Sequence, residues 1–184
     1  MITHQGTQVI ETRRLLLRPF TTADAQLMYD NWASDPEVTK YLTGPTHSSP
    51  EVTKAVLADW VSNYPRQNFY QWAIVLKELG QPIGSIGVVD LSENISKAEI
   101  GYCMGKAWWH QGIMTEALKA VMDYLFDRVG LNRVEAAHDA NNPHSGAVMK
   151  KCGMLCEGTH RQWGRNNQGV CDITVYALLA KDRG

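Results

Sequence analysis

The sequence lacks most of the features that mark a nucleic-acid-binding or membrane protein. Its 184 residues hold 18 Lys and Arg against 19 Asp and Glu, and a formal net charge of −1 provides no basic face for a nucleic-acid backbone. No apolar run of about 18 residues is present, and the first residues lack the apolar core of a signal peptide. We therefore expect a cytoplasmic protein without direct nucleic-acid or membrane binding.

Metal and nucleotide motifs are also absent. The four cysteines include no C-x-x-C pair, and the six histidines show no ligand spacing, so we expect neither a metal site nor a disulfide framework. The Gly-Lys-Ser/Thr ending of a P-loop and the three spaced glycines of a dinucleotide fingerprint are both missing. Because 44% of the residues are hydrophobic and no long linker divides the chain, residues 1–184 are expected to form a single domain.

The most informative segment is Trp108–Leu118, in which a glycine-containing loop leads directly into an amphipathic helix. From Met114 onward apolar residues recur at the 3.6-residue period, and Gly130 is a natural helix stop. The first turn of a helix leaves backbone N–H groups unpaired and favours negative charge. This pattern indicates either an ordinary helix start or a phosphate site. The candidate phosphate ligands are the backbone amides of Gly112, Ile113, Met114 and Thr115.

A second segment, His138–Met154, combines a strand end, a turn and a short helix. Residues 133–137 are typical of a strand, and Ser145–Cys152 of a helix that Gly153 closes. The carboxamide of Asn142 both donates and accepts hydrogen bonds, which suits the peptide-like arm of a ligand. Helix capping is the alternative role for Asn142.

Taken in order, these segments resemble the GNAT superfamily of acyl-coenzyme A dependent N-acetyltransferases, in the branch that includes the ribosomal-protein N-terminal (Rim-type) acetyltransferases. One departure is visible: where the family loop is usually Gln/Arg-x-x-Gly-x-Gly/Ala, this chain has Trp109 and Met114 at the two ends. Main-chain binding of phosphate tolerates such a side chain when it points into the core. The resemblance covers Glu11–Arg18, Pro82–Gly87, Ala98–Tyr102, Trp109–Ala117, Asn142–Gly153 and Cys156–Gly158.

The resemblance implies a mixed α/β fold of three layers (αβα) with a mixed, mostly antiparallel sheet. Acetyl-CoA would be the co-substrate, with its diphosphate on the amides of residues 111–115, Gln111 included, and its pantetheine arm between two splayed strands at about 96–104 and 133–140. The remaining pattern predicts a strand at 14–18, helices at 21–33 and from 50 onward, a hairpin of strands 69–76 and 83–90, and a second hairpin of strands 154–163 and 170–179.

The fold then indicates a direct transfer to an amine. Exposed backbone groups at Tyr102, Cys103 and Met104 would bind the pantetheine and polarise the thioester carbonyl. Cys103 is the alternative, covalent nucleophile, but no neighbouring His or Asp spacing activates it. Ser145 aligns with a position that lies near the departing thiolate in the ribosomal-protein branch, where its hydroxyl would stabilise sulfur; helix capping is its other explanation.

The pKa of the acceptor amine determines how strong a base the enzyme needs. A protein α-amine has a pKa near 7.7–8.0 and needs only a modest base, whereas a lysine near 10.4 is neutral in only about one molecule in 2,500 at pH 7. Glu99, on the strand beside the thioester, is the candidate base, and a solvent-facing strand carboxylate is the alternative. The favoured function is therefore acetylation of an N-terminal α-amine, such as that of a ribosomal protein.

Two other functions stay open. A small-molecule amine such as a polyamine or an aminoglycoside would need clustered carboxylates. The chain could also be a non-catalytic acyl-CoA binding module. The second hairpin is compatible with a homo-oligomer or with a capped edge. The carboxylates in the region of the acceptor, which a solvated helix face explains equally well, are Asp24, Asp30, Asp35 and Glu37.

Overall fold

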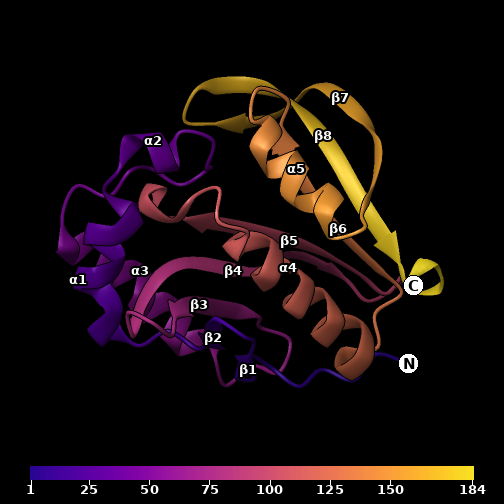
Figure 1. The fold of residues 1–184 in the computed structure, drawn as a ribbon, viewed down its shortest axis with the longest axis horizontal. Coiled ribbons are helices and arrows are strands. Elements are labelled where there is room, and N and C mark those ends of the chain that lie inside the picture. The colour runs from indigo at the N-terminus through magenta and orange to yellow at the C-terminus, as the bar shows by residue number, and fades with distance from the viewer.

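One eight-stranded sheet forms the middle layer of the protein (Figure 1). The computed structural model describes all residues, 1–184. The strands lie in the order β1-β2-β3-β4-β5-β6-β8-β7, and every neighbouring pair is antiparallel except β5 and β6, which are parallel. The predicted mixed, mostly antiparallel sheet is therefore confirmed. The strands are β1 (Ile10–Glu11), β2 (Leu15–Arg18), β3 (Gln71–Leu76), β4 (Gln81–Ser92), β5 (Lys97–Met104), β6 (Arg133–Asp139), β7 (Leu155–Asn166) and β8 (Gly169–Leu179).

Helices cover both faces of this sheet, which gives the three expected layers. Figure 1 shows α4 and α5 in front of the sheet, and α1, α2 and α3 at the left of the view. The core under α1 and α3 lies on the opposite face of the sheet from the core under α4. None of the helices is both long and apolar enough to cross a bilayer. The helices are α1 (Ala25–Met28), α2 (Pro36–Thr39), α3 (Pro50–Asn63), α4 (Ile113–Tyr124) and α5 (Pro143–Lys151).

The strand β3 shows why two cores form. Successive side chains of a strand point to opposite faces, so Trp72 and Ile74 join the core under α4, while Ala73 and Val75 join the core under α1 and α3. All four residues are buried. A strand covered on both sides has no polar alternation, which accounts for its nearly continuous apolar sequence.

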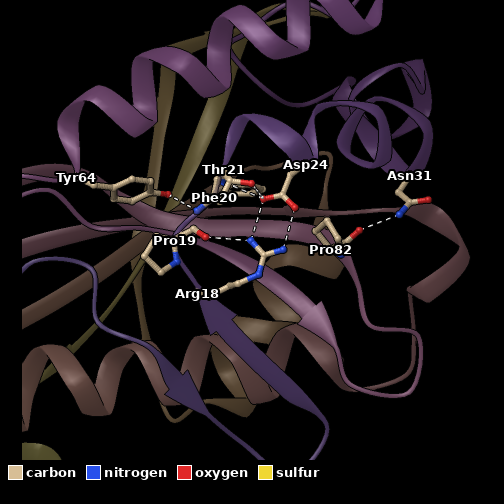
Figure 2. A network of polar contacts seen from close by, with 8 residues as sticks. All are labelled: Arg18, Pro19, Phe20, Thr21, Asp24, Asn31, Tyr64 and Pro82. Atoms are coloured by element: carbon tan, nitrogen blue, oxygen red, sulfur yellow. Dashed lines mark hydrogen bonds and ion pairs between the residues drawn. The ribbon is translucent and has the colours of Figure 1, made fainter.

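The chain enters α1 through a polar network that Figure 2 shows. The guanidinium of Arg18 donates two hydrogen bonds of 2.8 Å to the carboxylate of Asp24, and the backbone N–H of Thr21 donates to the same carboxylate at 2.9 Å. Burial alone would raise the pKa of Asp24, but Arg18 and Thr21 together hold it below its ordinary value. Asp24 is only 6% exposed, so the expectation of a solvated or cation-binding carboxylate is wrong at this position.

Two further residues in Figure 2, Tyr64 and Asn31, fix these helices to the sheet. The hydroxyl of Tyr64 accepts a 2.7 Å hydrogen bond from the backbone N–H of Phe20 and donates one of 2.9 Å to the carbonyl of Gln71. The amide of Asn31 donates to the carbonyl of Pro82 at 2.8 Å. The helices at this end are thereby anchored to β3 and β4, and the surfaces they present are fixed in position.

The long helix predicted from the apolar period that starts at Met114 begins at Ile113 and is continuous as far as Val129, with a wider turn over its last five residues. It ends at Gly130, which adopts the left-handed conformation with φ of 83°, as the sequence predicts. The second hairpin differs from the prediction. Its strands continue to Asn166 and restart at Gly169, because the ladder pairs these two residues, so the turn is shorter than the expected six-residue tip.

The sequence predicts one apolar side of α3, and this prediction is wrong in part. The predicted residues are Val52, Val56, Leu57, Trp60 and Val61. Leu57 is fully buried as expected, but Thr53 is the second fully buried residue of the helix. Val52 and Val61 are 38% and 36% exposed. The helix turns the Thr53 and Leu57 side toward the core, where the Thr53 hydroxyl lies 2.7 Å from Nδ1 of His47 and so has a hydrogen-bond partner.

Candidate active site

A fork between β5 and β6 opens the centre of the sheet. The two strands pair only at Lys97 with Arg133, Ala98 with Val134, and Glu99 with Glu135, and beyond Glu99 they have no common register. The predicted pair of splayed strands is thus present. Backbone groups on the β6 side of β5 beyond this point have no strand partner, and such groups need a ligand or water.

A cavity of about 1350 Å³ lies at this fork and gathers nearly all of the predicted site residues. It exceeds a typical small-ligand pocket of about 300–1,000 Å³, so there is room for a coenzyme and an acceptor together. Gln111 is the exception, because its side chain points back to the carbonyl of Ala107 at 3.2 Å. The predicted residues that line the cavity are Glu99, Tyr102, Cys103, Met104, Gly112, Ile113, Met114, Thr115, Asn142 and Ser145.

The loop before α4 has the geometry of an anion site. Gly112 is the residue before the helix and is left-handed, with φ of 73° and ψ of 8°. The first backbone bond of the helix runs from Glu116 N–H to the Gly112 carbonyl at 3.1 Å, so the amides of residues 111–115 have no acceptor within the helix. Ile113 and Met114 are 1% and 6% exposed. Because the side chain of Met114 is buried in the core, its size does not obstruct the main chain.

Arg14 supports this loop, and the sequence analysis missed it. Its guanidinium donates to the carbonyl of Gln111 at 2.9 Å and to the carboxylate of Glu116 at 3.3 Å. Glu116 lies in the first turn of α4, where a ligand phosphate would meet its negative charge. Arg14 offsets that charge and holds the loop. Only its place in a segment that resembles the family could have pointed to it, since it lies 97 residues from Gln111.

Tyr102 and Ser145 join the two sides of the fork. The hydroxyl of Tyr102 donates to the Ser145 carbonyl at 3.0 Å and lies 3.0 Å from the Ser145 hydroxyl. A phenol has one proton, so when the Tyr102 proton turns from the carbonyl to the serine oxygen, the Ser145 hydroxyl is free to donate its own proton to a ligand. Burial raises the pKa of Tyr102, which keeps it protonated.

The capping alternatives for Asn142 and Ser145 do not match the geometry. Asn142 precedes α5, but its side chain makes no capping hydrogen bond, and its carboxamide is left for the cavity. Ser145 lies within α5, and its hydroxyl contacts Tyr102 instead of a helix-end amide.

Glu99 is a carboxylate without a partner at the fork. The neighbouring cations are both engaged: Lys97 is 2.7 Å from Glu135, and Arg133 makes a double hydrogen bond with Glu157. No hydrogen bond or ion pair reaches the half-buried side chain of Glu99. Burial raises the pKa of Glu99, and the nearby charge of Glu135 raises it further. A carboxylate held in this way is suited to accept a proton.

Cys103 does not have the environment of a nucleophile. Its sulfur lies 3.4 Å from the hydroxyl of Ser85, and burial raises the pKa of the thiol, which disfavours the reactive thiolate. The carbonyl of Met104 accepts a 2.8 Å hydrogen bond from the indole N–H of Trp109. Of the backbone groups predicted to bind pantetheine, the Met104 carbonyl therefore already accepts a hydrogen bond from within the protein.

The fold and this site define a class of enzyme that transfers an acyl group from a coenzyme A thioester to an amine. Residues 14–155 match the model of the acetyltransferase (GNAT) domain, and the chain belongs to the GNAT acetyltransferase family. It is an acetyl-CoA dependent N-acetyltransferase.

Relatives with known sequences and structures agree with this assignment. The chain is 30% identical over 171 residues to the uncharacterized N-acetyltransferase YoaA of Bacillus subtilis (strain 168). The matched region covers 93% of this chain and 96% of that protein. It is 32% identical over 97 residues to the ribosomal-protein-serine acetyltransferase of Escherichia coli (strain K12), covering 51% and 54% of the two. The structure of RimL, a ribosomal L7/L12 alpha-N-protein acetyltransferase in complex with coenzyme A, has the same fold, with a TM-score of 0.84, 20% identity and coverage of 94% and 98%.

Proposed function

We propose that this enzyme moves the acetyl group of acetyl-CoA directly to a protein N-terminal α-amine, of the kind carried by ribosomal proteins. The observation that carries the proposal is the unpaired, half-buried Glu99 at the fork, opposite the Tyr102 and Ser145 hydroxyls. About a tenth of an α-amine is already neutral at pH 7, against about one lysine side chain in 2,500, so a single carboxylate suits an α-amine acceptor better. The relative from E. coli, by its name, acts on a ribosomal protein.

Each element of the site has a place in this reaction. Acetyl-CoA supplies an activated acetyl thioester. The amides of residues 111–115 hold the diphosphate, and the carboxamide of Asn142 holds the pantetheine arm. Backbone groups of Tyr102 and Cys103 polarise the thioester carbonyl, and the Ser145 hydroxyl, oriented by Tyr102, donates to the sulfur as its charge builds. Glu99 accepts the proton of the attacking amine, directly or through water.

Asn142→Ala is expected to weaken coenzyme binding. The carboxamide has no partner within the protein, so its loss removes ligand hydrogen bonds worth about 0.5–1.5 kcal/mol each and leaves the fold intact. Calorimetric titration with coenzyme A should show a Kd raised about three- to tenfold. The control is Asn63→Ala, at the far end of α3, whose amide donates to the carbonyl of Asp59 at 2.9 Å. An unchanged Kd for Asn142→Ala rejects its role.

An acceptor screen tests the function as a whole. The purified enzyme is incubated with acetyl-CoA and either peptides with a free N-terminus, the same peptides with a blocked N-terminus and one lysine, spermidine, or an aminoglycoside. Thiol release and product mass are recorded. The proposal expects acetylation of the free N-terminus alone. Acetylation of only the polyamine or aminoglycoside overturns it, and coenzyme binding without any thiol release indicates a binding module.

A further inference from the structure

The carboxylates that line the cavity leave one negative charge without a partner, which suits a ligand with a single positive charge. Five carboxylates line the cavity, and four of them have partners. Glu37 pairs with Lys106, Glu135 with Lys97, Glu157 with Arg133, and Asp139 accepts from the Asn166 side chain at 2.7 Å. Only Glu99 is free. A polyamine or aminoglycoside would bring several ammonium groups to a cavity with one unpaired carboxylate.

The other candidate carboxylates of the acceptor region are also engaged. Asp30 accepts two hydrogen bonds from the amide of Gln26, at 3.0 and 3.1 Å. Asp35 caps α2 by accepting from the N–H of Glu37 at 2.9 Å. Asp24 is buried against Arg18. None of Asp24, Asp30 and Asp35 lines the cavity, so they form no acidic cluster at the candidate acceptor site.

The wall of the cavity formed by α3 is apolar. Val52, Val56 and Trp60 recur every four residues and so form one stripe of the helix, and all three line the cavity. The core of the protein uses the adjacent stripe, Thr53 and Leu57. Trp60 also packs against Phe20, with ring centroids 5.2 Å apart, whereas Val52 and Val56 belong to neither core. An apolar helix stripe that faces a cavity is typical of a ligand site.

This wall and Glu99 belong to the same side of the sheet. Ala98 and Ile100 of β5 pack in the core under α4, so the alternating residues Glu99 and Cys103 point to the opposite face. Cys103 accordingly packs against the core that includes Leu57 of α3. The free carboxylate and the apolar stripe thus border one compartment of the cavity.

We propose that this compartment selects N-terminal α-amines whose first side chain is apolar, such as Leu, Met or Phe. The inference rests on the proposed function and adds a specificity to it. Glu99 attracts the single ammonium group, while Val52, Val56 and Trp60 bury the first side chain. A polar first side chain would lose its hydrogen bonds to water without gaining a partner on this wall, which costs binding free energy. Burial of a second, unpaired ammonium group would cost more.

The test compares peptides that differ only in their first residue, Leu, Phe, Ser or Ala, with acetyl-CoA saturating. We expect kcat/KM for Leu and Phe to exceed that for Ser by about tenfold or more, as apolar pockets discriminate. Val56→Thr replaces a methyl group of the wall by a hydroxyl of the same size and should reduce that ratio several-fold. Val61→Thr, on the same helix but outside the cavity, is the matched control and should leave the ratio unchanged.

The outcomes separate the two proposals. If Ser and Ala peptides react as well as Leu and Phe peptides, or if Val56→Thr and Val61→Thr leave the same ratio, the apolar specificity is overturned while the N-terminal acetyltransferase remains. If no peptide of any kind is acetylated and spermidine is, both fail. Circular dichroism melting of the two variants checks that each is folded.

Discussion

Glu99→Gln is expected to lower kcat by about 10²- to 10⁴-fold, the usual contribution of a general base. Glutamine has the size of glutamate and no charge to place among Lys97 and Glu135, so the fold should persist. Binding of acetyl-CoA should stay near the wild-type affinity, since Glu99 faces the acceptor side of the sheet. Steady-state kinetics at saturating acetyl-CoA measure kcat, and calorimetry measures the affinity. The control is Glu78→Gln, in the exposed turn between β3 and β4.

The pH dependence gives an independent reading of the same residue. Glu99 accepts a proton only when it is ionised, so activity is present above its pKa and falls as the pH drops through it. Because burial raises this pKa, the fall occurs at a higher pH than for an ordinary glutamate. In Glu99→Gln that acidic limb should disappear, which leaves only the limb of the acceptor amine near its pKa of about 8. A variant that keeps both its turnover and its acidic limb shows that Glu99 is not the base.

The helix start that we propose as the coenzyme site could be predicted because its signals are local in the sequence. Gly112, the helix period from Met114 and the stop at Gly130 all lie in one segment, and the backbone amides of a helix start depend on few distant contacts. Arg14 could not be found in this way, because its contact with Gln111 joins the residue before β2 to the distant loop before α4. The unpaired state of Glu99 is likewise a property of two strands, since it depends on Lys97 being taken by Glu135.

The acceptor side was less predictable for a physical reason. A helix stripe that lines a cavity has the same 3.6-residue period as a stripe that enters the core, so Val52 and Leu57 cannot be distinguished by pattern alone. The acidic residues Asp24 and Glu37 carry the same ambiguity, because only the fold brings Arg18 and Lys106 to them. Local sequence therefore predicts where the donor binds better than it predicts what accepts.

Ser145→Ala is expected to lower kcat by about 10²-fold, as the loss of a hydrogen bond to developing charge does, with little change in KM for acetyl-CoA. Tyr102→Phe removes the hydroxyl that lies 3.0 Å from that serine, and should lower kcat by about tenfold through misorientation of Ser145. Tyr124→Phe is the control, because its hydroxyl bonds the carbonyl of Gly6 and is remote from the cavity.

The double variant decides whether Tyr102 acts through Ser145. If it does, adding Tyr102→Phe to Ser145→Ala should cost nothing further, since the group it orients is already absent, and the double-mutant cycle should show a coupling free energy of about 1–2 kcal/mol. Equal losses from Tyr102→Phe with and without Ser145 would mean that the two hydroxyls act independently. Wild-type kcat in Ser145→Ala would instead remove the serine from the mechanism. Because burial keeps the Tyr102 phenol protonated, its orienting hydrogen bond should persist over the whole pH range in which Glu99 titrates.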